Sequence, residues 1–436
     1  MVTSLFVEYL AKIFPKLQNV IDKVNEKRNA NLTYLHKTML RKVYSADQKW
    51  TSASVNTTYV AADVVAMDSP LPIKKRDSIA HANGTLPKVG MKKHLFESDI
   101  NAINIMKAQG QDWTLIANKL TNDPVACSVG IDEQNEASFL TGLSEGIVAI
   151  TDENNTGTAL RINFNYLPGN SFGVQAAGEI TLDDVRNVLS KAGENGDAII
   201  TIALALSTYN KLRQTQGAKE LAANYRGQTF DSNTKLPVPA AALFDEAFAD
   251  DSNGVKFLKI DRSVISEKNG KRKSYKPWNA DKVIYLTSDE VGALVWGTLA
   301  EKTNPVEGVV YSTVDEYKLI SRYRTTDPLT ETTSGQALVL PVIENIDQVY
   351  SQDISEAQAL DEDAELADTT DVKITVWGVA YKKPEFIAEL KTISGERIAV
   401  NIGDAKLIAK VNELSDEQEA ALKAAVESHK APVSQG

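Results

Sequence analysis

Residues 143–152 read Leu-Ser-Glu-Gly-Ile-Val-Ala-Ile-Thr-Asp and mark the point where one kind of pattern gives way to another. Upstream, apolar residues recur at helical spacing across 132–145, and Gly146 is placed to end that helix. Four apolar residues at 147–150 then begin a strand. After a turn-rich stretch, residues 160–166 alternate between apolar and polar side chains, which is typical of a half-buried strand. The stretch therefore predicts a helix that runs directly into a β-hairpin.

The chain downstream of this junction mixes helices and strands. Thr181 and Asp184 form a capping pair for a helix, and Ser207 is a second N-cap candidate. Residues 264–275 predict a hairpin around the Asn269-Gly270 turn. An acidic linker and a small α/β appendage at 372–436 complete an α+β chain.

Helical patterns dominate the chain upstream of the junction. They cover 98–106, 113–120 and, most strongly, the amphipathic stretch 3–28, in which Pro15 is expected to kink or split the helix. The apolar face of this N-terminal helix, with Phe6 and Phe14, has two readings. It packs against the chain's own core, or it binds a neighbouring subunit.

Between the N-terminal helix and 98–106 lies an extended segment from about Trp50 to Lys93 that is poor in core-forming residues. A strand signal at 59–67 includes Tyr59 and Val64. About 17 extended residues reach roughly 55 Å at 3.3 Å each. A segment of that length with no core of its own predicts an arm that lies on another copy of the chain. We therefore expect subunit-interface residues here: Tyr59, Val64, Lys74, Lys75, Arg76 and Pro87.

Composition and charge narrow the functional classes. The chain has 436 residues, of which 43% are apolar and 24% charged, which suits a globular protein of two or three domains. Its net charge of −11 argues against coating nucleic acid. Residues 1–93 carry 15 basic against 7 acidic side chains, a net of +8, whereas 353–371 carry 8 acids and no base. These are two solvated stretches, or they face different environments; on the second reading the basic part faces inward.

Cysteine content and hydropathy bear on disulfide bonds, membrane spans and signal peptides. Cys127 is the only cysteine, so no intramolecular disulfide can form. No apolar run reaches the roughly 18 residues of a membrane span. The N-terminus lacks the pattern of a signal peptide, since Glu8 and Lys12 interrupt its apolar stretch.

No catalytic, cofactor or metal motif is recognisable in the sequence. There is no phosphate-binding or dinucleotide-binding glycine loop and no hydrolase nucleophile elbow. The four histidines, His36, His81, His94 and His429, do not have zinc-ligand spacing. Cys127 with His94 is the one nucleophile–base pair to consider, and a buried structural cysteine is the simpler interpretation. We expect no catalytic residue, no cofactor and no metal, and a protein that is not an enzyme.

The order of these signals resembles the major capsid proteins of tailed bacteriophages with the Hong Kong 97-type fold, especially the lambda-type branch. The resemblance is carried by the basic Pro-Leu-Pro-Ile-Lys-Lys-Arg loop at 70–76, Leu-Pro-Lys-Val at 86–89, the helix–hairpin junction at 143–152, and Leu-Pro-Val-Ile-Glu-Asn at 340–345. It covers about residues 50–354. The N-terminal helix and the C-terminal appendage fall outside it.

The resemblance implies a layout for the chain. Residues 1–50 correspond to an N-terminal helical arm and 51–95 to an extended loop over a neighbour. Residues 96–177 with 331–354 correspond to a peripheral domain holding a long spine helix, and 178–330 to an axial domain. The acidic linker is then 355–371, and the appendage and tail 372–436.

The resemblance also implies partners and a location. The family builds icosahedral heads from hexamers and pentamers around double-stranded DNA, so the chain is expected in the virion, assembled in the bacterial cytoplasm. Portal, scaffolding and decoration proteins are expected partners, DNA is contacted weakly if at all, and no membrane is involved. Because the sequence begins at Met1, we expect a separate scaffold, or none, instead of a cleaved N-terminal segment. Alternatives are an encapsulin-type compartment, a soluble enzyme without a recognisable motif, and a phage tail or adhesion protein.

Overall fold

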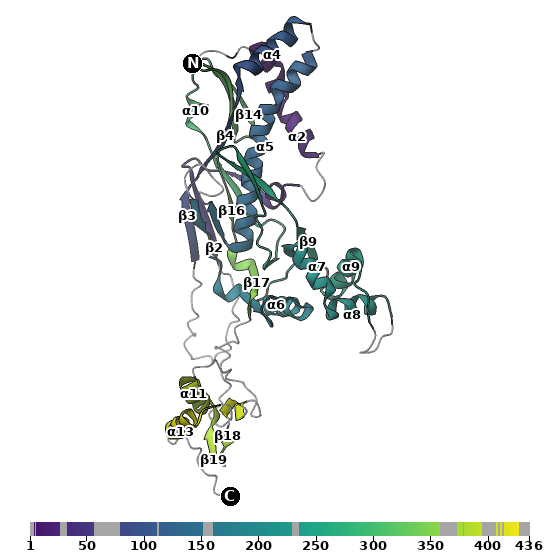
Figure 1. Ribbon diagram of the computed structural model, residues 1–436, viewed down its shortest axis with the longest axis vertical. Coiled ribbons are helices and arrows are strands. Elements are labelled where there is room, and N and C mark those ends of the chain that lie inside the picture. The colour runs from purple at the N-terminus through teal and green to yellow at the C-terminus, as the bar shows by residue number, and fades with distance from the viewer. Residues whose placement is uncertain are drawn as a thin grey trace, which may run out of the picture. The chain divides into compact units, whose positions relative to one another are not determined.

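A computed structural model describes residues 4, 6–26, 33–55, 79–110, 113–150, 160–228, 235–357, 373–377, 379–394, 407–408, 410–411 and 414–426. The chain divides into two compact units, Met1–Ala357 and Gln358–Gly436. Both contain helices and strands (Figure 1), so the predicted α+β class is confirmed.

Pro15 splits the N-terminal helix, as predicted, because proline cannot donate the backbone hydrogen bond that a continuous helix needs. The pieces are α1 (Val7–Ile13), the 3-10 turn η1 (Phe14–Lys16) and α2 (Leu17–Glu26). Their buried apolar side chains are Phe6, Leu10, Phe14, Leu17 and Ile21. These form one cluster with side chains of α4 (Glu97–Ala108), α5 (Trp113–Glu145), β14 (Val310–Val314) and β15 (Lys318–Thr326). The structure thus favours the reading in which this helix packs on the chain's own body.

Helix α5 is continuous over 33 residues, about 50 Å at 1.5 Å per residue. The prediction of two separate helices at 113–120 and 132–145 was wrong, because the helix runs through Pro124. Proline at this position has no N–H for the carbonyl of Leu120. The buried Arg322 on β15 supplies a replacement, since its Nη1 donates to the Leu120 carbonyl at 3.1 Å. A partner distant in sequence therefore makes the proline tolerable.

This explanation predicts an energetic coupling between Arg322 and Pro124. In a Pro124→Ala background the residue at 124 supplies its own N–H to Leu120, so Arg322→Met removes one hydrogen bond fewer. We expect Arg322→Met to cost about 1 kcal/mol less in that background than in the parent chain. Urea unfolding of the four chains measures the difference. Strictly additive effects would contradict the explanation, and the loss of the Glu331 partner cancels because it occurs in both backgrounds.

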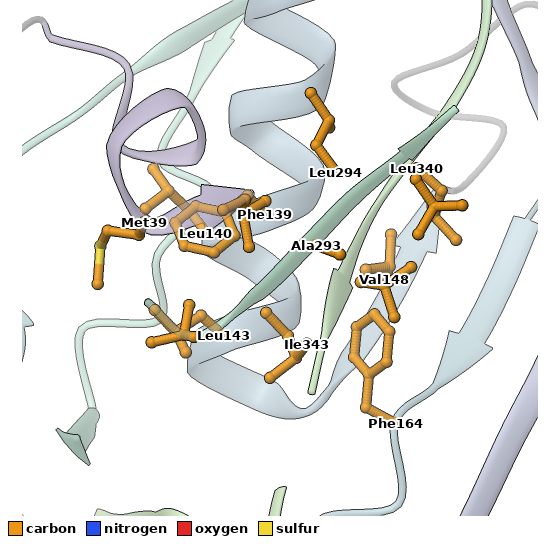
Figure 2. Packing of buried hydrophobic residues seen from close by; sticks show 14 of the residues in the cluster. Met39, Phe139, Leu140, Leu143, Val148, Phe164, Ala293, Leu294, Leu340 and Ile343 are labelled. Carbon is orange, nitrogen blue, oxygen red and sulfur yellow. The ribbon is translucent and has the colours of Figure 1, made fainter. Parts of the chain in front are cut away.

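A six-stranded sheet lies against α5. Its strand order is β1-β13-β16-β15-β14, and β4 also pairs with β16. Besides β14 and β15, the sheet contains β1 (Leu40–Tyr44), β4 (Lys88–Phe96), β13 (Gly292–Gly297) and the 15-residue β16 (Leu329–Ile343). Figure 2 shows the main core, where Leu140 and Leu143 of α5 meet Ala293 and Leu294 of β13 and Leu340 and Ile343 of β16.

Residues 143–150 form the predicted junction of helix and hairpin, whereas 151–152 lie outside the described residues and the second strand ends at Asn163 instead of at the expected position 166. Helix α5 ends at Glu145, Gly146 takes a positive φ of 69°, and β5 (Ile147–Ile150) pairs antiparallel with β6 (Leu160–Asn163). Val148 and Phe164 point back into the main core (Figure 2). The junction of helix and hairpin is therefore fixed by burial on both sides of the glycine.

A second, five-stranded sheet has the order β7-β17-β12-β8-β9. These strands are β7 (Ser171–Val174), β8 (Thr201–Ala205), β9 (Lys256–Ile260), β12 (Lys282–Leu286) and β17 (Val349–Ala357). Its helices are α6 (Leu182–Glu194), α7 (Leu206–Gln214), α8 (Gln216–Tyr225) and α9 (Ala241–Asp251), which share a core with it. The first unit also contains the short elements α10 (Ala300–Thr303), η3 (Pro168–Asn170) and η4 (Ile346–Gln348).

Most of the caps and turns predicted for residues 181–275 are confirmed. Thr181 and Asp184 form a capping box at the start of α6, as predicted. The hairpin of β10 (Val264–Lys268) and β11 (Lys271–Tyr275) turns at Asn269-Gly270, where φ is positive at both residues. Ser207 is not an N-cap, and that prediction was wrong. The cap position of α7 is Ala205, because β8 runs directly into the helix.

The C-terminal unit has a core of its own. It contains β18 (Lys373–Val376), β19 (Val379–Lys382), α11 (Lys383–Ser394) and α13 (Asp416–Ala425), which Ser415 caps as predicted. Buried Phe386, Leu390 and Leu422 are among the side chains that hold it together. Strand β17 of the first unit extends to Ala357, three residues into the segment read as a linker, and 358–372 lie outside the described residues.

Candidate assembly surfaces and the buried charge cluster

A two-stranded hairpin is a candidate assembly surface. Strands β2 (Lys49–Val55) and β3 (Ile79–Thr85) pair antiparallel, from Lys49 opposite Thr85 to Val55 opposite Ile79. Trp50 fixes its base: the side chain is 4% exposed and packs edge-on against Phe164. Gly84 faces Trp50, and a Cβ there would lie 2.8 Å from the indole nitrogen.

Among the described residues, no third strand pairs with this hairpin. An isolated two-stranded sheet is marginally stable in water and needs further strands or packing against another surface. Trp50 ties the hairpin to the body at its base, and another chain is a suitable source of further contacts.

The structure describes only some of the predicted interface residues. Tyr59, Val64, Lys74, Lys75 and Arg76 lie outside the described residues. Their role at an interface stays a prediction.

Pro87 lies half-buried between β3 and β4, and its carbonyl accepts a hydrogen bond from the Val339 N–H at 3.4 Å. Phe6 and Phe14 are only 2% and 8% exposed, because they fill the chain's own apolar cluster. As long as that packing holds, these two side chains are not available to a neighbour.

A buried group of charges is the most distinctive polar feature of the body. We call it the charge cluster and define it by six residues: His36, Lys37, Asp132, Glu136, Asp315 and Lys318. His36 and Lys37 come from α3 (Leu35–Met39), the two acids at 132 and 136 from α5, and the last pair from the turn between β14 and β15 and the start of β15. Three segments far apart in sequence therefore meet here.

Lys318 lies at the centre of the charge cluster with 0% of its side chain exposed. Its ammonium is 2.6 Å from a carboxylate oxygen of Asp132 and 2.6 Å from one of Asp315. Lys37 contacts the same two carboxylates at 3.0 and 3.3 Å. Each of these carboxylates is thus shared by two ammonium groups, which compensates for its removal from water.

His36 and Glu136 form the other half of the charge cluster. The Nδ1 of His36 lies 2.6 Å from Glu136 Oε2, and its Nε2 lies 3.8 Å from Asp132. Glu136 also accepts the backbone N–H groups of Leu35 and His36 at 3.0 and 3.1 Å. These are N-terminal donors of α3 that have no partner within that helix. A side chain of α5 therefore caps α3.

The charges shift one another's ionisation. Burial opposes the charged form of Asp132, but contact with His36 and the charges of Lys318 and Lys37 outweigh it and hold the pKa of Asp132 far below its ordinary 3.8. The pKa of Asp315 is lowered as well: burial again opposes ionisation, and Lys318 and Lys37 overcome it. Burial likewise opposes the charge of Lys37, yet Asp132 and Asp315 raise its pKa above 10.5. At neutral pH these three groups are ionised.

Sequence reasoning missed the charge cluster. The available signal was Asp132 and Glu136, two acids one helical turn apart on a helix otherwise rich in apolar residues. Nothing local pointed to their partners near positions 36 and 318.

The residues considered for catalysis have structural surroundings. Cys127 is buried, with its sulfur near the carbonyl oxygens of Thr333 and Met91, at 3.9 and 4.0 Å. Burial, reinforced by Asp123, raises the pKa of this thiol to about 12, so it stays protonated. His94 instead contacts the hydroxyl of Thr332 at 2.9 Å.

Asp184 and Asp251 also have structural roles. Asp184 accepts the backbone N–H of Thr181, as the capping interpretation predicts, and also accepts the backbone N–H of Gln175. Asp251 pairs with Arg186 at 2.7 Å. Within the described ranges, no group of three or more His, Cys, Asp or Glu side chains is arranged to hold a metal ion. None of the helices in those ranges is both long and apolar enough to cross a membrane.

Comparison with known proteins gives structural but no sequence relatives. No family model matches the chain, and no curated protein does. The chain is similar to a prophage capsid protein of E. coli CFT073, with 11% identity and a TM-score of 0.45 over 77% of this chain and 97% of that one. It is similar to the capsid of cyanophage A-1(L), with 11% identity and a TM-score of 0.43 over 73% and 92%. It is also similar to the SrpI encapsulin of Synechococcus elongatus PCC 7942, with 11% identity and a TM-score of 0.35 over 77% and 95%.

Proposed function

We propose that the chain is a shell-forming structural subunit, the major capsid protein of a tailed bacteriophage, and not an enzyme. The observation that carries the proposal is the β2–β3 hairpin, which leaves a compact body and pairs with no third strand in the part of the chain that the structure describes. A subunit that is completed by its neighbours has such an element. A neighbouring copy of the chain can supply the packing that the two strands do not provide for themselves.

The layout implied by the resemblance is part of the proposal, although the two sheets cross its bounds: β13, β14 and β15 fall within 178–330 but lie in the six-stranded sheet, and β7 and β17 fall outside that range but lie in the five-stranded sheet. Helix α5 serves as the spine helix of a peripheral domain, together with nearly all of β16 and the start of β17. The region 178–330 supplies most of an axial domain, including three strands of the five-stranded sheet and helices α6 to α9. The hairpin and the residues between its strands form the extended loop that lies on the next subunit.

The remaining expectations belong to the same proposal. Hexamers and pentamers close an icosahedral head around double-stranded DNA in the virion, assembled in the host cytoplasm. Portal, scaffolding and decoration proteins complete it. A net charge of −11 limits non-specific adhesion of DNA to the wall.

Electron microscopy of the expressed full chain, alone and with a candidate scaffolding protein, tests the proposal. We expect closed particles of uniform size that contain nuclease-protected DNA when the packaging proteins are present. A compact monomer under all these conditions would overturn the proposal. Particles that hold a protein cargo, without a portal and without DNA, would replace it with the encapsulin alternative.

The extended loop offers a sharper prediction. Replacing residues 56–78 with a short Gly-Ser turn keeps the paired strands and removes the reach of the loop. We expect a folded chain, judged by circular dichroism and gel filtration, that yields at least tenfold fewer closed particles on electron micrographs. Truncation after Ala357, which removes the separate second unit, is the control and is expected to leave particle numbers unchanged. Full particle yield from the shortened loop would refute the role given to it.

A further inference from the structure

The N-terminal part of the first unit is attached to the body differently from the rest. We call the described residues 6–26 and 33–38 the strap. Backbone pairing with the body starts immediately after it: Val291 N–H donates to the Met39 carbonyl at 2.9 Å, and β1 pairs with β13 from Leu40 onward. The hydrogen bonds described between the strap and the body involve side chains. Gln18 exchanges two with Asp315, and Glu136 accepts two from the start of α3.

Further contacts of the strap are an exposed ion pair between Glu8 and Lys107 of α4, 2.6 Å apart, and apolar packing. Its buried face meets Ile100 and Ile103 of α4, Leu120 of α5, and Val314 and Ile320 of the six-stranded sheet. Such a face can leave and return as a unit, because the described residues of the strap belong to no strand of a sheet. The charge cluster then decides how firmly the strap is held, since it contains the most deeply buried polar contacts at the end of the strap.

The balance of charge in the cluster depends on pH. Its carboxylates are Asp132, Glu136 and Asp315, and its bases are Lys37, Lys318 and His36. With all six ionised the charges cancel. Protonating Asp132 and Asp315 removes the anions that face Lys37 and Lys318, and an unpaired buried ion costs several kcal/mol.

Other titratable groups adjoin the cluster. Glu133 of α5 pairs with Arg262 at 2.9 Å and accepts from the Tyr34 hydroxyl. Tyr317 of the β14–β15 turn lies close to Asp132 and Asp315, and burial raises its pKa well above 10. Neither tyrosine nor arginine titrates in acid, and Glu133 has its own cation.

We propose that the strap is a pH-operated element that the charge cluster holds on the body at neutral pH and releases in acid, before the body itself unfolds. Lys37 of the strap, and for Asp132 also His36, help to lower the pKa of Asp132 and Asp315, so the chain with its strap released binds more protons at these two carboxylates. The stability that they contribute is therefore present above their ordinary pKa of 3.8 and is lost progressively as pH falls below it. Release uncovers the apolar faces of both the strap and the body.

Thiol labelling of the unassembled full chain tests the proposal, whether or not the chain builds shells. In a Cys127→Ala background, one variant carries Ile21→Cys in the strap and another Leu286→Cys in the main core; both native side chains are at most 1% exposed. Labelling with dithiodipyridine, normalised to the urea-unfolded chain at each pH, reports opening. Between pH 6 and pH 3 we expect at least a tenfold rise for Ile21→Cys and little change for Leu286→Cys.

A charge-matched variant completes the experiment. Asp132→Asn with Lys318→Met removes one anion and one cation, and we expect it to reduce the acid-induced rise at Ile21→Cys at least threefold. Three outcomes would overturn the proposal: both cysteines opening together, Ile21→Cys staying protected down to pH 3, or the full rise persisting in the charge-matched variant. Particle formation is not measured, so failure here is distinct from failure of the proposed function.

Discussion

Lys318→Met is expected to destabilise the first unit by about 3–5 kcal/mol, the usual cost of removing one partner from a buried ion pair. The Lys318 side chain is fully buried and lies 2.6 Å from each of two carboxylates. Without it, Asp132 keeps only the partly exposed Lys37 and the imidazole of His36 as partners. Urea unfolding, followed by circular dichroism, measures the loss as a shift of the midpoint at unchanged slope.

Two controls separate this effect from the loss of any lysine. Lys276→Met removes an ion pair of the same 2.6 Å length with Asp261, but both side chains are largely exposed, so a change below about 1 kcal/mol is expected. The double variant Asp132→Leu with Lys318→Met removes the stranded anion and is expected to recover most of the stability. Equal losses from Lys318→Met and Lys276→Met would show that the charge cluster has no special weight.

Features could be predicted from the sequence where a few neighbouring residues determine the local conformation. Asn269-Gly270 fits a tight turn, Thr181 and Asp184 satisfy the start of α6 by themselves, and Gly146 ends a helix that has reached its last apolar position. Such features require only a few neighbouring residues. They also fixed the α+β class, because helical and alternating patterns occur in both halves of the chain.

Features that depend on contacts between distant segments could not be predicted from the sequence. Pro124 reads as a helix breaker until Arg322 is known to lie beside Leu120. Lys318 reads as a surface lysine on a strand until Asp132 is brought to it. Hydrophobic periodicity also does not show whether the strap packs on its own chain or on a neighbouring subunit, because both arrangements require the same apolar helical face.

Gly292→Ala is expected to be the most damaging small substitution in the first unit. Gly292 begins β13, which pairs with β1 on one side and β16 on the other. A Cβ at this position would overlap the carbonyl oxygen of Val342 and lie within 3.1 Å of backbone atoms of Ile343 and Glu344. Those atoms belong to the backbone of the neighbouring strand and of the loop after it, so relief requires separating β13 from β16 and not merely turning a side chain.

We expect Gly292→Ala to cost at least about 4 kcal/mol, a loss seen only with a specific mechanism such as this overlap, and to leave little folded protein on gel filtration. Gly193→Ala in the last turn of α6 is the matched control. A Cβ there meets nothing within 4 Å, and alanine favours a helix over glycine by up to about 1 kcal/mol, so unchanged or slightly higher stability is expected. The two substitutions add the same methyl group, and their difference therefore isolates the approach of β13 to β16. A folded Gly292→Ala chain with the parent unfolding midpoint would mean that these strands are farther apart than the structure places them.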